Sequence, residues 1–247
     1  LLCLVAMEPP VDLSADSVRT EKVKILQTLP RWSPEQVHTH VVRGQYVAGS
    51  LQGEVVPGFL QEKGVAPDSR TETYVALRFM LNTWRWAGVP FVLRTGKRLP
   101  KRATEIAIEF RNPPTTFFEP DTEGGSHVNQ LILNIQPKDG ISLGFQAKIP
   151  ASRRRLRSVR MDFRYGTAFA RPAPEAYQRL LLDVMLGDPT LFTRTDEVEA
   201  AWQFITPILD AWQLPDAPPP HSYEAGSWGP EAADHLAAQD GIRWRRL

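Results

Sequence analysis

The chain has 247 residues, of which 42% are hydrophobic and 23% charged, and its formal net charge at pH 7 is +1. A charge so close to balance gives no overall attraction to nucleic acid or to an anionic membrane, and no apolar run approaches the roughly 20 residues that a membrane-spanning helix needs. We therefore expect neither nucleic acid nor a membrane as a partner. The single cysteine excludes an internal disulfide and fits a reducing compartment, so we expect a cytoplasmic protein.

The first elements predicted along the chain are helices. Residues 1–7 are typical of the end of an apolar helix, which two following prolines stop. Since no Met, signal peptide or capping residue precedes this segment, we interpret the chain as a fragment whose upstream half is missing. A second helix is expected to start near Ser14 or Asp16 and to end at about Leu29.

A series of strands is predicted next. The first covers Val37–Arg43, and the glycine-containing stretch 44–67 is expected to be an extended surface loop. Later strands are expected at residues 71–81, 103–110, 129–136, 141–149 and 157–165. Loops between them are indicated by Pro113-Pro114 and by Glu123-Gly124-Gly125. Because the connections are too short for crossover helices, the sheet should be mainly antiparallel.

Helices are expected to close the chain. Pro174 suits the first position of a helix that Gly187 ends. Thr195 is predicted to cap the next helix, in which Pro207 should cause a kink. A short helix over Glu231–Gln239 is expected last.

This order of elements predicts an α+β fold: a large, mainly antiparallel β-sheet with helices packed on one face, in a single domain over residues 1–247. In strand 129–136, Leu131, Leu133 and Ile135 point one way and Ile132 points the other way. Helices on one face cannot cover both sets of side chains. We therefore expect the chain to associate with a second copy through this sheet.

The stretch Val89–Arg102 holds the strongest candidate for a binding site. A short apolar run, Pro90–Leu93, is typical of a buried strand, and five cations follow it. Gly96 lets the backbone turn tightly directly before Lys97. A cation at the end of a buried strand is well placed for an anionic ligand, and Lys acts on phosphate as a point charge. The alternative interpretation is a solvated basic loop between two strands.

Other motifs give weaker candidates. His38 and His40 could place two imidazoles on one face of the predicted strand, but ordinary histidines are favoured over a metal site. The arginine-rich run 153–157 is interpreted as a solvated strand entry, with a second anion site as the alternative. No Gly-x-Gly-x-x-Gly turn occurs, so the chain lacks a dinucleotide-binding fingerprint. We expect no bound metal.

Motifs along almost the whole chain resemble one enzyme family. They are Leu-Leu-Cys-Leu-Val-Ala-Met-Glu-Pro-Pro at 1–10, Val-Arg-Thr-Glu-Lys-Val-Lys at 18–24, Gly-Gln-Tyr at 44–46, Leu-Arg-Thr-Gly-Lys at 93–97, Asn-Gln-Leu through Gln-Pro at 129–137, Tyr-Gln-Arg-Leu-Leu-Leu-Asp-Val at 177–184, Asp-Glu through Ile-Leu at 196–209 and Gly-Ser-Trp-Gly-Pro at 226–230. In this order they resemble the C-terminal part of glucose-6-phosphate dehydrogenase, although no single motif is diagnostic.

The resemblance implies which residues contact the substrate. Lys97 falls on the Lys of the family's Gly-Lys motif, Arg102 on a basic position five residues later, and Gln136 on a Gln that borders the sugar phosphate. The three are therefore expected to bind the phosphate of glucose 6-phosphate, with a plain strand-end amide as the alternative for Gln136. No catalytic residue is expected, because the family's motif Arg-Ile-Asp-His-Tyr-Leu-Gly-Lys-Glu and its cofactor motif Gly-x-x-Gly-Asp-Leu are both absent from the sequence.

The resemblance also implies an activity for the parent enzyme. That enzyme oxidises glucose 6-phosphate to 6-phosphogluconolactone by hydride transfer from C1 to NADP, the first step of the oxidative pentose phosphate pathway. The upstream half would bind NADP and supply the base, and this chain would supply phosphate-binding cations and the interface of a homodimer or homotetramer. The chain alone is expected to be inactive. The alternative is a non-catalytic binding or regulatory module of the same fold.

Overall fold

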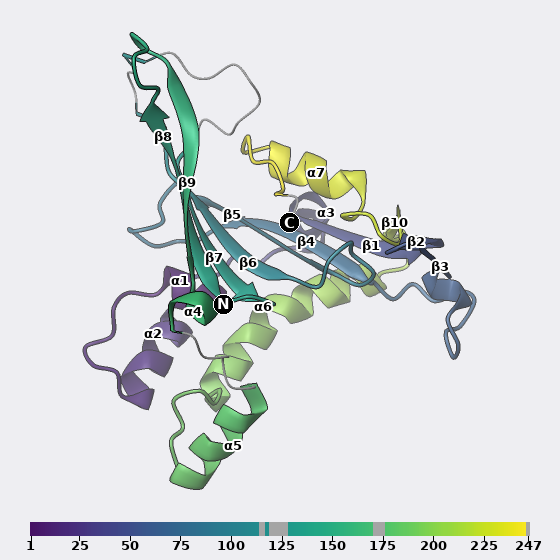
Figure 1. The fold of residues 1–247 in the computed structure, drawn as a ribbon. Coiled ribbons are helices and arrows are strands. Elements are labelled where there is room, and N and C mark those ends of the chain that lie inside the picture. The colour runs from purple at the N-terminus through teal and green to yellow at the C-terminus, as the bar shows by residue number, and fades with distance from the viewer. Residues whose placement is uncertain (114–116, 119–127, 170–175, 246–247) are drawn as a thin grey trace. The chain divides into compact units, whose positions relative to one another are not determined.

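The computed structural model describes residues 1–113, 117–118, 128–169 and 176–245. By its internal contacts the chain divides into two compact units, one formed by Leu1–Pro100 with Tyr177–Arg246 and the other by Lys101–Ala176 with Leu247. Figure 1 shows the elements of both. Two sequence predictions lie outside the described residues: the 123–125 loop and the helix start at Pro174.

The first unit is built on a four-stranded sheet with the strand order β10-β1-β4-β5. Its strands are β1 (Val41–Val47), β4 (Tyr74–Met80), β5 (Pro90–Gly96) and β10 (His221–Glu224). β4 pairs antiparallel with β1 and β5, whereas β1 and β10 run parallel. A hairpin of β2 (Gly49–Leu51) and β3 (Glu54–Val56) and the 3-10 turn η1 (Phe59–Gln61) follow β1.

Six α-helices are described over the same part of the sequence. They are α1 (Leu2–Ala6), α2 (Ala15–Gln27), α3 (Pro34–His40), α5 (Ala176–Leu186), α6 (Thr195–Gln213) and α7 (Glu231–Ala238). The predicted start of α2 is confirmed, because the side chain of Ser14 accepts a hydrogen bond from the Ser17 N–H. α6 begins one residue earlier than predicted: Arg194, not Thr195, occupies its N-cap, and its side chain makes no cap hydrogen bond.

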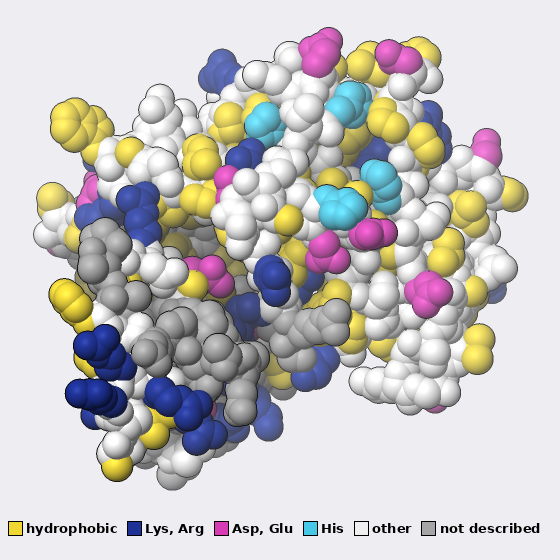
Figure 2. Space-filling model, turned by 90° about the horizontal axis from the view of Figure 1, so that it is seen from above, with side chains coloured by type: hydrophobic (Ala, Val, Ile, Leu, Met, Phe, Trp, Pro, Cys, Tyr) yellow, Lys and Arg dark blue, Asp and Glu magenta, His cyan; other side chains and the backbone are white. Residues whose placement is uncertain are grey.

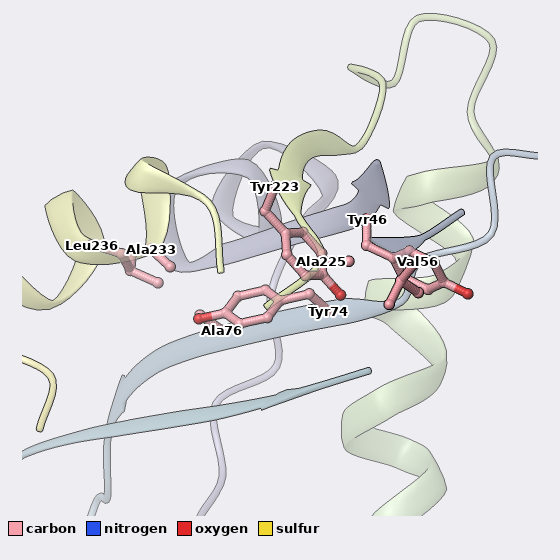
Figure 3. Close-up of a cluster of buried hydrophobic side chains, with 8 residues drawn as sticks. All are labelled: Tyr46, Val56, Tyr74, Ala76, Tyr223, Ala225, Ala233 and Leu236. Carbon is pink, nitrogen blue, oxygen red and sulfur yellow. The ribbon is translucent and has the colours of Figure 1, made fainter. Parts of the chain in front are cut away.

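The alternation along β4 decides which helices cover which face of the first sheet. Leu77 and Phe79 pack in an apolar cluster with α1, α2 and Phe204 of α6. Tyr74 and Ala76 point the other way and pack with residues of α7, as Figure 3 shows. Helices therefore lie on both faces of this sheet, and not on one face as predicted. The reason is that the β4 residues on the second face, Tyr74 and Ala76, are also apolar enough to pack against α7.

The stretch predicted as a strand over Val37–Arg43 begins as a helix instead. Ser33 caps α3, Pro34 occupies its first turn and the Gln36 side chain accepts from the Ser33 backbone N–H. This capping box fixes a helix start that outweighs the strand preference of the following residues. The predicted loop 44–67 likewise contains the end of β1, the β2–β3 hairpin and η1.

The second unit contains a four-stranded antiparallel sheet in the order β6-β7-β8-β9. Its strands are β6 (Thr104–Glu109), β7 (Gln130–Gln136), β8 (Gly140–Lys148) and β9 (Leu156–Arg164), and the one-turn helix α4 (Tyr165–Ala168) follows. The α+β class and the mainly antiparallel pairing are thus confirmed. Instead of one large sheet, the described strands form two four-stranded sheets and the β2–β3 hairpin, because β5 ends at Gly96 and the chain turns before β6 begins.

The register of the second sheet gives it one apolar face. Two rows of paired residues cross all four strands on this face: Ile106, Leu133, Ile141 and Phe163, and next to them Ile108, Leu131, Leu143 and Met161. We call these two rows the apolar face. The row between them, Ala107, Ile132, Ser142 and Asp162, lies on the opposite side. The predicted opposition of Leu131 and Leu133 to Ile132 is therefore confirmed.

No helix among the described residues is both long enough and apolar enough to cross a membrane.

Candidate functional site

Lys97 stands directly after the last residue of β5, as the sequence predicts. That last residue, Gly96, pairs with Tyr74 of β4. A Cβ at this position would lie 2.6 Å from Cδ2 of the Tyr74 ring, so the close packing of strand and ring requires glycine. The side chain of Lys97 is exposed, and its ammonium forms no ion pair with another residue that the structure describes. It is therefore available to an anionic ligand.

The backbone of Lys97 is held on both sides although its side chain is exposed. Its N–H donates to the carbonyl oxygen of Thr73 at 2.8 Å, and its own carbonyl oxygen accepts from the hydroxyl of Tyr223 at 2.9 Å. Tyr223 is buried and belongs to β10, far away in the sequence. The strand end that presents the lysine is thus fixed by two hydrogen bonds to the core of the first unit.

The next residue, Arg98, is bound to the protein rather than free for a ligand. Its backbone has a left-handed φ of 52°, and its carbonyl oxygen accepts from the Gly226 N–H at 2.7 Å. Its guanidinium donates to Glu62 at 2.7 Å, and the hydroxyl of Tyr46 donates to the same carboxylate oxygen at 3.1 Å. These contacts, that with Arg98 above all, lower the pKa of Glu62. Of the two neighbouring cations, Lys97 is the one left open.

Arg102 and Gln136 lie at neighbouring strand ends of the sheet in the second unit. Arg102 is exposed and stands two residues before β6 begins at Thr104. Gln136, also exposed, ends β7 and pairs with Thr104. The antiparallel register therefore brings the predicted cation and the predicted amide to neighbouring strand ends. The prediction that these two and Lys97 share one phosphate stays a prediction.

The two histidines considered for a metal site do not lie on a strand. His38 and His40 belong to α3, where Nδ1 of His40 lies 2.9 Å from the carbonyl oxygen of Gln36 and its ring stacks on Trp32. Because α3 is helical, the two imidazoles do not lie on one face of a strand, as the sequence had suggested. Within the described ranges, no group of three or more His, Cys, Asp or Glu side chains is arranged to hold a metal ion.

The arginine-rich run 153–157 covers the end of the turn between β8 and β9 and the first two residues of β9. The Ile149 N–H donates to the carbonyl oxygen of Arg155, and the Ser152 hydroxyl donates to the carbonyl oxygen of Ile149. The turn is therefore ordered by hydrogen bonds within itself. The arginine side chains themselves are exposed. Lys and Arg side chains gather in one region of the molecular face drawn in Figure 2. The run agrees with the interpretation as a solvated strand entry.

The described residues do not form the usual dinucleotide cradle. β1 and β10 run parallel, but the strand pairs of both four-stranded sheets are otherwise antiparallel. No described strand leads through a glycine-rich turn into a helix and on to a parallel neighbour. The residues present therefore do not fit a nicotinamide dinucleotide bound in the Rossmann manner.

Sequence reasoning did not find Tyr223, Thr73 and Glu62, which hold the loop around Lys97. Tyr223 lies on a strand of four residues, too short to show a period, and it reaches Lys97 only because β10 pairs with β1. Glu62 follows η1 in the stretch predicted as a plain loop. The one local signal was the set of turn residues after Tyr223, which include Gly226.

Comparison with known proteins supports the same conclusion as the sequence motifs. The family described as glucose-6-phosphate dehydrogenase, C-terminal domain, matches residues 1–245. Glucose-6-phosphate 1-dehydrogenase of Aggregatibacter actinomycetemcomitans is 50% identical over 246 residues, which are 100% of this chain and 49% of that protein. The Mycolicibacterium smegmatis protein of the same name is 49% identical over 244 residues, 99% of this chain and 49% of its own length.

Solved structures agree. A crystal structure of glucose-6-phosphate 1-dehydrogenase from Mycobacterium avium matches with a TM-score of 0.79 and 37% identity over 100% of this chain and 48% of its own. A glucose-6-phosphate dehydrogenase in complex with its substrate glucose-6-phosphate matches with a TM-score of 0.85 and 33% identity, over 99% of this chain and 49% of its own. The chain spans about half the length of the relatives it matches. It belongs to the glucose-6-phosphate dehydrogenase C-terminal domain family.

Proposed function

We propose that this chain is the C-terminal domain of an NADP-dependent glucose-6-phosphate dehydrogenase of the cytoplasm. The complete enzyme would transfer hydride from C1 of glucose 6-phosphate to NADP. The proposal is supported by the family match over residues 1–245, which covers both compact units as one domain, and by relatives of that name of which the chain spans about half.

The observation that carries the proposal is the lysine at the end of β5. Lys97 combines an exposed ammonium with a backbone held by Thr73 and Tyr223, while its neighbour Arg98 is engaged by Glu62. A cation fixed at its base and free at its tip suits the phosphate of a sugar phosphate. Arg102 and Gln136, at neighbouring strand ends of the second sheet, are proposed as further phosphate contacts.

In this division of labour the chain binds and orients the substrate, and the hydride acceptor and the base come from outside it. The described residues provide neither a dinucleotide cradle nor the family's catalytic histidine motif. Phosphate binding far from the reacting C1 contributes by holding the sugar in place, so that the binding energy of a remote group serves the reaction.

We also propose that the chain forms a homodimer or homotetramer through the apolar face of its second sheet. On this face Leu143 is 38%, Met161 62% and Phe163 40% exposed, and the two apolar rows continue across all four strands. A contiguous apolar sheet face that stays wet is costly, and a second copy of the same face would cover it with twofold symmetry.

Enzyme kinetics test the proposed function. The purified 247-residue chain should not reduce NADP with glucose 6-phosphate.

In a complete enzyme that carries this chain as its C-terminal half, Lys97→Ala should raise KM for glucose 6-phosphate about ten- to a hundredfold, as expected for a charge-assisted hydrogen bond of about 1.5–3 kcal/mol. Lys24→Ala, which removes an exposed lysine of α2, is the matched control. Turnover by the isolated chain, or a parent-like KM for Lys97→Ala, would contradict the proposal.

A further inference from the structure

A series of hydrogen bonds inside the first unit ends on the backbone of Lys97. The Tyr46 N–H donates to Oγ1 of Thr73 at 3.0 Å, that hydroxyl lies 3.0 Å from the hydroxyl of Tyr223, and Tyr223 lies 2.9 Å from the carbonyl oxygen of Lys97. Tyr46 is 7%, Thr73 9% and Tyr223 4% exposed. The series is therefore shielded from water, where each hydrogen bond is stronger and neighbouring bonds polarise one another.

Counting hydrogens fixes the direction of the series. A phenol has one hydrogen to donate and a carbonyl oxygen can only accept, so the Tyr223 hydroxyl donates to Lys97. Thr73 Oγ1 accepts from Tyr46 and has its own hydrogen left to donate. Of its two acceptors, the Tyr223 hydroxyl at 3.0 Å is closer than the Gly44 carbonyl oxygen at 3.5 Å, so we assign this hydrogen to Tyr223. The alternative acceptor for Tyr223, the Thr73 carbonyl oxygen, is farther away at 3.2 Å and already accepts from the Lys97 N–H. The Lys97 carbonyl is thus the better acceptor for this hydrogen.

The segment that contains Tyr223 holds two consecutive carbonyl groups of the loop. Tyr223 binds the carbonyl oxygen of Lys97, and the Gly226 N–H binds that of Arg98 at 2.7 Å. On the other side, the Lys97 N–H is bound to Thr73. The peptide groups before and after the lysine are therefore both fixed, which sets the direction in which its side chain leaves the backbone.

We propose that Tyr223 is a positioning residue for the phosphate-binding lysine: its buried hydroxyl fixes the carbonyl group of Lys97 and so places the ammonium. This inference rests on the proposed function, in which Lys97 contacts the phosphate of glucose 6-phosphate. Tyr223 itself does not touch the substrate. A lysine side chain is long and flexible, so its ammonium reaches one point reliably only if the backbone that carries it is fixed.

A double-mutant cycle in a complete enzyme that carries this chain as its C-terminal half tests the inference. The variants are Tyr223→Phe, Lys97→Ala and the two together, each assayed for KM and kcat with glucose 6-phosphate. We expect Tyr223→Phe to raise KM about three- to tenfold with kcat within about twofold of the parent. In the Lys97→Ala background the same replacement should leave KM unchanged, because no ammonium is left to place.

Two further sets of variants separate positioning from loss of stability. Thr73→Val removes the hydroxyl that donates to Tyr223 and should raise KM in the same way. Thr73→Ser keeps the hydroxyl, so its KM should equal that of the parent. Thr28→Val removes a hydroxyl-to-carbonyl bond of the same kind, from Thr28 to Ile25 at 2.7 Å, at the end of α2. It should lower the thermal midpoint to a similar degree without changing KM.

The outcomes are distinct. If Lys97→Ala binds substrate like the parent, the proposed function of the lysine fails. If Lys97→Ala raises KM but Tyr223→Phe does not, or raises it equally in both backgrounds, the positioning role is overturned and the function of the lysine stands. If Tyr223→Phe does not fold, Thr73→Val and Thr73→Ser decide by the same criterion: equal KM values for the two would overturn the inference.

Discussion

Lys22 of α2 and Glu197 of α6 form an ion pair that joins two helices distant in the sequence. Glu197 is only 8% exposed, and its second carboxylate oxygen has no hydrogen-bond partner. A buried charge that depends on one partner is costly to leave alone. The pair therefore makes the packing of α2 on α6 sensitive to changes at either residue.

We predict that Lys22→Met lowers the free energy of unfolding by about 3 kcal/mol, the lower end of the range for breaking a buried pair, because the Lys22 side chain is still 20% exposed. Replacing both residues, Lys22→Met with Glu197→Leu, should recover most of this loss, since no charge is then left buried. Urea unfolding of the three proteins measures both effects. The half-exposed pair of Arg85 with Glu8 is the control, and Glu8→Gln should stay close to the parent. A double variant less stable than Lys22→Met would contradict the argument.

Gly229, which lies just before α7, is predicted to tolerate replacement poorly. Its φ is +110°, and a Cβ would lie 2.4 Å from Cε2 of the buried Tyr74 ring. Gly229→Ala adds a backbone cost of about 1–2 kcal/mol to an overpacking cost of about 1–3 kcal/mol, so we expect a loss of about 3 kcal/mol in denaturant unfolding. Gly64→Ala isolates the backbone cost, because Gly64 has a φ of +86° with nothing within 4 Å of the added Cβ. Equal losses for the two variants would show that the Tyr74 ring yields.

Elements with a clear local signal could be predicted from the sequence. The strand predicted over residues 71–81 is present as β4, and Ser14 caps α2. The prediction failed at Val37, where β-branched residues indicated a strand. At this position the capping box of Ser33 and Gln36 favours a helix, because it gives hydrogen-bond partners to backbone N–H groups at the helix start. The sequence contained that signal, and the strand pattern hid it.

Part of the candidate site could be predicted from local sequence and part could not. The exposure of Lys97 after a glycine at a strand end follows from local residues alone. Its fixation by Tyr223 does not, because β10 is four residues long and gains its place only by parallel pairing with β1. Contacts of this kind depend on the assembled sheet and leave no period in the sequence. The second face of the first sheet was missed for the same reason, since α7 reaches it from the chain end.

Alkaline unfolding should depend on Tyr74. Burial raises the pKa of Tyr74 to about 12, with the nearby Arg94 guanidinium acting in the opposite direction. The unfolded chain loses this proton near the ordinary tyrosine pKa of about 10, whereas the folded chain keeps it. Stability is therefore complete below about pH 10 and falls above it by up to about 1.4 kcal/mol per pH unit for this one group.

Urea unfolding between pH 8 and 11 measures the effect. Tyr74→Phe should lose less stability above pH 10 than the parent does. It should still lose some, because burial also raises the pKa of Tyr46 and of Tyr223. Identical pH dependence in the parent and in Tyr74→Phe would show that the Tyr74 phenol does not stay protonated in the folded protein.

The last prediction concerns the apolar face. Leu143 of β8 and Met161 of β9 are paired across neighbouring strands of this face, and both stay exposed in the single chain. If a second copy covers the apolar face, a charge there must be buried without a partner. Met161→Glu should therefore convert the oligomer to a monomer, which light scattering at micromolar concentration would record as a mass near 27.8 kDa.

Ser158, also exposed on β9, points to the opposite face because it is an odd number of residues from Met161. Ser158→Glu is thus the matched control and should leave the oligomer intact. A parent chain that is already a monomer at every concentration, or a loss of association with Ser158→Glu and not with Met161→Glu, would place the interface elsewhere.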